Sequence, residues 1–156
     1  MKVETIRFGT LEIDDQSIIR MPRGPLGFED ENEFCMIQHR PDCNFQWLQS
    51  IHDPRLAFVV VDPTMFVEGY EFEISDSDVE KLHLTSDDEA LVLAITTITN
   101  GGKDITLNLA APVVINSREL LGMQIVLQNE SYSVRHVVAV APAEQTSEEV
   151  TTAKAA

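Results

Sequence analysis

The five residues Ala57 to Val61, with the sequence AFVVV, place the strongest constraint on the fold of this chain. Asp53 and Pro54 precede the run, and Asp62 and Pro63 follow it. Proline lacks an amide N–H and restricts the residue before it, so each Asp-Pro pair ends regular structure. A short apolar run rich in β-branched and aromatic residues between two such boundaries is typical of a fully buried strand. We therefore expect the rest of the chain to pack around this strand.

Similar short segments recur along the 156 residues and predict an all-β protein. About nine or ten short strands are expected, at spacings of roughly 8–12 residues. The candidate segments are residues 3–8, 11–13, 18–21, 34–38, 45–49, 57–61, 70–74, 91–98, 105–109, 112–115, 123–128 and 131–139, the last being either a strand or an arm. Helices are too few and too short to supply the crossovers of a parallel sheet. The sequence predicts a closed or partly open barrel of mainly antiparallel short strands with one or two short helices, formed by one domain over residues 1–140.

Turn signals separate these segments. Residues 22–30, PRGPLGFED, contain two prolines and two glycines and predict an ordered loop that Phe28 anchors to the core. Residues 100–102, NGG, predict a type I′ turn, because Asn-Gly accepts positive φ. Residues 118–122 predict a further turn. A hairpin between the segment that carries the only tryptophan, Trp47, and the buried strand would place the indole beside that strand.

The chain is strongly acidic, and this limits its partners. Eleven Lys and Arg stand against 26 Asp and Glu, which gives a formal net charge of −15. Such a surface repels phosphate backbones and anionic lipid, so neither nucleic acid nor a membrane is an expected partner. It suits a basic protein partner, or it serves solubility alone. Residues 141–156 lack aromatic residues and periodicity and are expected to form a disordered acidic tail.

Cysteine usage and apolar content predict a cytoplasmic protein. Cys35 and Cys43 do not form a disulfide framework, and Cys35 is expected to be a buried free thiol. The N-terminus has no apolar signal-peptide core, and no apolar run approaches the ~18 residues of a membrane helix. The expected environment is therefore the reducing cytosol.

No catalytic or cofactor motif is present. The four histidines do not pair with another His, Cys or Glu at metal-ligand spacing, and neither HExxH nor CxxC occurs. No serine lies in a GxSxG frame, and no phosphate-binding glycine loop lies between a strand and a helix. We therefore expect no enzyme activity, no cofactor and no metal site.

The residues most suited to function lie at 66–78, FVEGYEFEISDSD, which we call the acid–aromatic segment. The wider stretch of residues 68–89 contains nine acids and one lysine. Alternation over residues 70–74 predicts a half-exposed strand with a carboxylate face. Ser75, with Asp78 three residues later, predicts the start of a short helix that ends near His83.

Acids interleaved with aromatic residues fit a docking surface for a basic, amphipathic partner. A solvated face, or a metal or catalytic site, are the alternatives for the same charge run. The residues predicted to bind a partner are Phe66, Glu68, Tyr70, Glu71, Glu73, Asp76 and Asp78.

Seven segments spread over residues 3–136 match the sequence pattern of one protein family. They are VETIRFGTLEID, GPLGFED, FQWLQSIHDPRLAFVVVDP, YEFEISDSDVEKL, LVLAITTI, KDITLNLAAPVVIN and QIVLQNESYSVRH. The most specific patterns are WLQS-x-x-DP-x-LAFVVVDP and NL-x-AP-x-VIN, and the segments are diagnostic in combination. In these segments the chain resembles the flagellar assembly factor FliW family.

The resemblance implies a small, β-barrel-like, cytosolic protein without catalytic residues. Family members bind flagellin before export, and they bind CsrA, a small RNA-binding translational repressor. Free flagellin occupies FliW and releases CsrA to repress flagellin translation, whereas export of flagellin frees FliW to sequester CsrA. A few kcal/mol of differential affinity would suffice for such a switch.

The residues themselves leave two other readings open. One is a small-molecule-binding β-barrel, or an enzyme whose residues come from distant strands, and this reading requires a deep pocket with convergent polar groups. The other is a purely structural subunit of a larger assembly.

Overall fold

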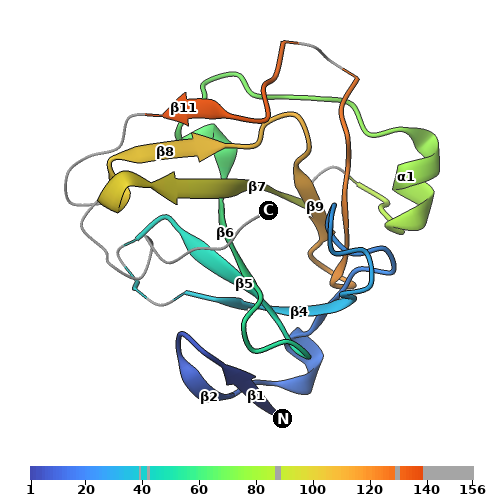
Figure 1. Ribbon diagram of the computed structural model, residues 1–156. Coiled ribbons are helices and arrows are strands. Elements are labelled where there is room, and N and C mark those ends of the chain that lie inside the picture. The colour runs from blue at the N-terminus through green and yellow to red at the C-terminus, as the bar shows by residue number, and fades with distance from the viewer. Residues whose placement is uncertain (39, 42, 87–88, 129–130, 139–156) are drawn as a thin grey trace.

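The computed structural model describes residues 1–38, 40–41, 43–86, 89–128 and 131–138. In this part of the chain, eleven strands, one α-helix and short 3-10 turns form an all-β structure whose strands make a partly closed ring, as predicted (Figure 1). The strands are β1 (Lys2–Thr5), β2 (Gly9–Glu12), β3 (Ile19–Arg20), β4 (Glu33–Ile37), β5 (Gln46–Ser50), β6 (Ala57–Val61), β7 (Ala90–Thr99), β8 (Asp104–Leu107), β9 (Val113–Asn116), β10 (Leu121–Gln124) and β11 (His136–Val138).

Strand β6 is the predicted buried strand, and it lies inside the nine-stranded sheet. All five of its residues are at most 1% exposed. It pairs antiparallel with β5, where Trp47 lies opposite Val59, and with β7, where Ile95 lies opposite Val60. The predicted hairpin that brings Trp47 beside this strand is therefore confirmed.

Strand β7 closes the ring because, in addition to β6, it pairs with two further strands along its length. Leu93 in its first half lies opposite Val113 of β9, and Ile98 in its second half lies opposite Ile105 of β8. The order β7-β6-β5-β4-β3-β10-β9 then returns to β7. The seam between β3 and β10 is a single parallel pair, so the ring is only partly closed.

Two groups of strands lie outside the ring. β8 pairs with β7, and β11 pairs with β8 as the edge of the sheet. β1 and β2, which correspond to the candidate segments 3–8 and 11–13, form an N-terminal hairpin as a separate two-stranded sheet. β1 ends at Thr5, because residues 6–8 form the turn of this hairpin. The hairpin covers Trp47 with Phe8, whose ring centroid lies 5.6 Å away edge-on, and with the Arg7 guanidinium, 4.8 Å from the indole centroid.

The alternation of side chains along β6 divides the interior into two cores. Phe58 and Val60 pack among residues that come from six strands of the ring and fill its interior, which we call the inner core. Val59 and Val61 pack on the opposite face, in an outer core that β8 and the acid–aromatic segment cover. Side chains alternate between the two faces of a strand, so a strand that is buried on both faces needs an apolar residue at every position.

The loop at residues 22–30 packs onto the ring as predicted. The Phe28 ring lies edge-on to Phe58, with centroids 5.4 Å apart. A side chain at Gly24 would collide with the carbonyl oxygens of Phe28 and Glu31, so only glycine fits this turn. Gln124 fixes the loop to β10 by accepting a hydrogen bond from the Leu26 amide (2.8 Å).

Local signals for the helix and the Asn-Gly turn are also confirmed. Helix α1 (Asp76–Lys81) begins after Ser75, whose hydroxyl accepts a hydrogen bond from the Asp78 amide (3.1 Å). Asn100 and Gly101 both have positive φ, at 60° and 66°, in the turn between β7 and β8.

Two strand predictions require correction. Residues 70–74 form no strand, because a strand requires a hydrogen-bonded neighbour and the amide and carbonyl of Glu71 are both bonded to the Tyr132 hydroxyl instead (3.2 and 3.0 Å). Strand β10 begins at Leu121, inside the predicted turn at 118–122, and ends at Gln124 rather than at residue 128. The Ile125 amide still donates to Pro112 (2.9 Å), but proline has no N–H to return the bond, and the ladder stops.

The last predicted strand is confirmed in part, as β11. The expected tail at residues 141–156 lies outside the described residues. Among the helices in the described ranges, none is both long enough and apolar enough to span a bilayer.

We expect Val60→Ala to lower the free energy of unfolding by about 2–3 kcal/mol, because it removes two methyl groups from a fully buried position and leaves a cavity. The matched control is Val137→Ala in β11, where the side chain is 75% exposed and the loss should stay within about 0.5 kcal/mol. Urea denaturation measures both values, and equal losses would contradict the central role of β6.

Candidate functional site

The acid–aromatic segment crosses the surface from the end of β6 to α1 (Figure 1). Its aromatic residues anchor it to the outer core. Phe66 stacks on Phe45 with ring centroids 5.9 Å apart, and Phe72 lies 5.7 Å from Tyr70. The segment is therefore held against the ring without being a strand.

Tyr70, one of the predicted partner-binding residues, is largely buried at the floor of the surface. Its side chain is 7% exposed, and its hydroxyl donates to the Leu109 carbonyl (2.7 Å). Burial, with Tyr132 nearby, raises the pKa of this hydroxyl. A tyrosine in a half-exposed alternating pattern faces the core when its hydroxyl can reach a backbone acceptor.

The carboxylates of the segment face solvent. Glu68, Glu71, Glu73 and Asp76 are exposed, and Asp78 is half-buried in the first turn of α1. Within the described residues these side chains form no ion pair, although Lys81 lies on the same short helix. Unpaired acids on a chain of charge −15 leave a negative surface open to a basic partner.

Two grooves flank Glu71–Glu73. The helix-side groove has a volume of about 610 Å³ and reaches from Phe72 and Ile74 to apolar residues of α1, the following loop and β7. The strand-side groove has a volume of about 790 Å³ and separates the same acids from residues 125–128. The predicted acidic residues therefore form a ridge between two apolar-floored depressions.

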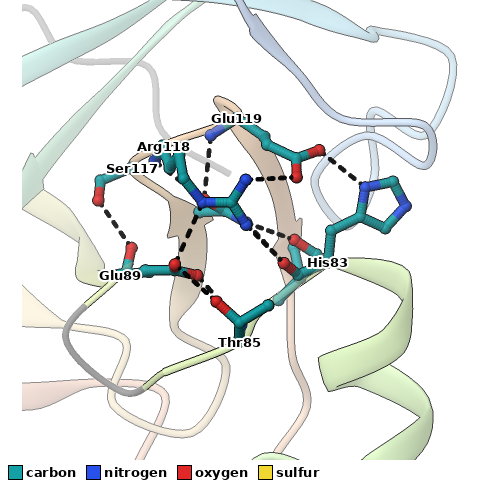
Figure 2. Close-up of polar contacts among 8 residues, drawn as sticks. His83, Thr85, Glu89, Ser117, Arg118 and Glu119 are labelled. Atoms are coloured by element: carbon teal, nitrogen blue, oxygen red, sulfur yellow. Dashed lines mark hydrogen bonds and ion pairs between the residues drawn. The ribbon is translucent and has the colours of Figure 1, made fainter.

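A polar cluster centred on Arg118 fixes the end of α1 to the turn between β9 and β10, and we call it the Arg118 clamp (Figure 2). The guanidinium donates to a Glu89 carboxylate oxygen (Nε, 3.1 Å), to Glu119 (3.0 Å) and to the His83 carbonyl (3.2 Å). Glu119 also contacts Nδ1 of His83 at 2.8 Å.

Glu89 accepts two further hydrogen bonds in the clamp, from the amide (3.1 Å) and the hydroxyl (2.7 Å) of Thr85. The bonds from Thr85 and then Arg118 lower the pKa of the Glu89 carboxyl to about 2. Asn116 completes the attachment, because its buried side-chain amide donates to the Leu82 carbonyl (2.8 Å). The clamp thus holds the far wall of the helix-side groove.

The clamp was not predicted from the sequence. Its members come from two stretches of the chain, residues 82–85 with Glu89 and residues 116–119, and no sequence motif links the two stretches. The sequence predicts strands for the apolar groove residues, such as Val92 and Val126, and indicates no functional role for them. Both valines lie within apolar runs of the sequence, and no pattern in those runs shows which side chains lie next to the acids.

The described residues contain no candidate metal site. No group of three or more His, Cys, Asp or Glu side chains there is arranged to hold a metal ion. The interior of the ring is filled by large buried side chains, among them Phe34, Leu48 and Phe58. What remains accessible is the surface, and the structure is that of a small β-ring protein with an acidic ridge and two grooves.

Comparisons with known proteins give the family. A family model described as FliW protein matches residues 2–138. Flagellar assembly factor FliW of Desulfitobacterium hafniense (strain DSM 10664 / DCB-2) is 40% identical over 136 residues, which cover 87% of this chain and 90% of that protein. The corresponding protein of Leptospira biflexa is 34% identical over 149 residues, covering 95% and 97%.

A crystal structure of the flagellar assembly factor FliW superposes with a TM-score of 0.81 at 34% identity, over 88% of this chain and 96% of that one. The chain belongs to the FliW family of flagellar assembly factors. The resemblance drawn from the seven sequence segments is confirmed.

We expect Glu89→Gln to destabilise the protein in a pH-dependent manner. The folded pKa of Glu89 is about 2, below the ordinary value of 4.5, so its stabilisation is complete above about pH 5 and is lost as pH falls towards 2. The difference in free energy of unfolding between wild type and variant should therefore shrink over that interval. Urea denaturation across the pH series measures it, with Glu12→Gln on the hairpin as control. A difference that does not change with pH would contradict the clamp's role.

Proposed function

We propose that this protein binds flagellin in the cytoplasm and antagonises the translational regulator CsrA by partner switching, so that flagellin translation follows export. Membership of the FliW family is the observation that carries the proposal. On this account the protein acts by binding, and it is not an enzyme.

The charge distribution supports a basic protein as one partner. A net charge of −15 favours association with a positively charged, RNA-binding surface and disfavours RNA, DNA and anionic lipid themselves. Glu71 and Glu73 stand unpaired on the ridge between two grooves, where a partner's cations would meet them. Electrostatic complementarity of this kind raises association rates and makes them sensitive to salt.

Partner switching needs only a difference in binding free energies. If flagellin and CsrA cannot occupy the protein together, the partner with the higher ratio of concentration to Kd displaces the other. Moving the occupancy from about 1:99 to 99:1 requires roughly 5.5 kcal/mol of differential free energy. Changes in the free flagellin concentration supply part of that difference without any chemical step.

The filled inner core argues against a small-molecule-binding barrel. Phe34, Phe58 and Leu48 are fully buried at the centre of the ring, where a lipocalin-like ligand would lie. A purely structural subunit would instead form a stable complex in which two partners do not compete.

We expect reversal of Glu71, Glu73, Asp76 and Asp78 to lysine to weaken CsrA binding by about tenfold or more at low salt, because four repulsive contacts replace attractive ones. Calorimetry or fluorescence anisotropy measures the Kd. The control is the double variant Glu12→Lys with Asp30→Lys, at two exposed acids outside the segment. Affinity within about twofold of wild type would mean that the acidic ridge is only solvated surface.

The competition itself is tested with three purified proteins. Titrating flagellin into the preformed complex with CsrA should release CsrA in proportion to flagellin bound. If neither protein binds, the proposed function is wrong. If both bind at once with undiminished affinity, the switching part of it is wrong.

A further inference from the structure

The strand-side groove lies between two extended stretches of backbone that have free hydrogen-bonding groups. One wall is Glu71–Ser75 and the other is Ile125–Gln128. Ile125 is buried and Leu127 half-buried, while the intervening Val126 is exposed by 56%. This is the alternation of a strand, although no ladder is completed there.

Hydrogen bonding in residues 125–128 uses one edge only. The Ile125 and Leu127 amides donate to the carbonyls of Pro112 and Ala110 (2.9 and 2.8 Å). In an extended segment the N–H and C=O groups of alternate residues point to opposite edges, so those of Val126 and Gln128 point away from that neighbour. Within the described residues they have no hydrogen-bond partner.

The facing wall of the groove, Glu71–Ser75, also has backbone groups without hydrogen-bond partners among the described residues. The backbone groups of Phe72, Glu73 and Ile74 form no hydrogen bond with any described residue, whereas those of Glu71 are bonded to Tyr132. Unpaired backbone groups along an extended edge are a template for the addition of a strand.

The side chains that line the groove define what such a strand must carry. Glu71, Glu73 and Asp78 contribute carboxylates, and the described residues that line the groove include no lysine or arginine. Phe72, Ile125 and Val126 contribute an apolar floor. A strand that alternates cationic with apolar residues presents one set to the carboxylates and the other to this floor.

We propose that the strand-side groove binds an extended segment of a partner protein by strand addition, and that this segment alternates basic and apolar residues. The proposal names the mode by which a basic partner is held, and to that extent it rests on the proposed function. It differs from general charge attraction because it requires backbone hydrogen bonds to the groove walls.

The test uses a fluorescent peptide of about eight residues, the length of an ordinary strand, in which Lys and Val alternate. Fluorescence anisotropy at about 50 mM salt measures its affinity for the full chain. We expect saturable binding that weakens by about tenfold when Glu71 and Glu73 are changed together to lysine. The matched control, Glu12→Lys with Asp30→Lys, changes the net charge equally and should retain affinity within about twofold.

Two N-methylated peptides separate strand addition from charge attraction. Methylation of the backbone nitrogens of every Val, or of every Lys, removes the donors of one edge and leaves all charges in place. At least one of the two should bind about tenfold more weakly than the parent peptide. If both bind like the parent, or if the control variant loses as much affinity as the groove variant, strand addition is wrong.

These experiments distinguish failure of the groove inference from failure of the proposed function. Should CsrA or flagellin bind tightly while the alternating peptide does not, the groove inference is overturned and the function stands. Should the peptide bind as expected while neither protein does, the groove inference stands and the function is overturned.

Discussion

Burial of β6 on both faces is the constraint on which the rest of the structure depends. A strand of five apolar residues cannot leave either face in water, so one core must form on each side. The ring of strands encloses one face, and β8, the N-terminal hairpin and the acid–aromatic segment cover the other. The acid–aromatic segment is thus a structural requirement as well as a candidate binding surface, because Phe66, Tyr70 and Phe72 pack on the outer core.

Because large side chains fill the interior of the ring, the candidate binding features lie on its surface. The fully buried Phe58 and Phe34 occupy the centre of the ring, where β-barrels that bind ligands hold them. Around Glu71–Glu73 the surface offers an acidic ridge, two grooves beside it, and an incomplete ladder beyond β10. Both grooves exist because Glu71–Ile74 crosses the surface without pairing as a strand, while the Arg118 clamp holds α1 and its loop in place on the far side.

Sequence patterns predicted local structure well where short-range chemistry decides it. The Ala57–Val61 strand, the Ser75 cap and the Asn-Gly turn all follow from residue type and spacing. The wrong predictions concern segments whose structure depends on residues far away in the sequence. Whether residues 70–74 form a strand depends on a neighbour, and the Tyr132 hydroxyl, 61 residues from Glu71, takes that place. Pro112 shortens β10 for the same kind of reason. The seven proposed binding residues lie in one segment of the sequence. Tyr70 nevertheless faces inward, because its hydroxyl reaches the Leu109 carbonyl. The opposite wall of the strand-side groove comes from residues 125–128, far away in the sequence.

The central claim is that this member of the FliW family binds partners on the ridge and grooves around Glu71–Glu73 while its core stays unchanged. Hydrogen exchange of the full chain, measured with and without a bound partner protein, tests it most directly. We expect new protection of amides in residues 71–75 and 126–128, where the free protein has few backbone hydrogen bonds, and no change in the β1–β2 hairpin. Protection confined to the hairpin, with the groove walls exchanging as in the free protein, would contradict this account.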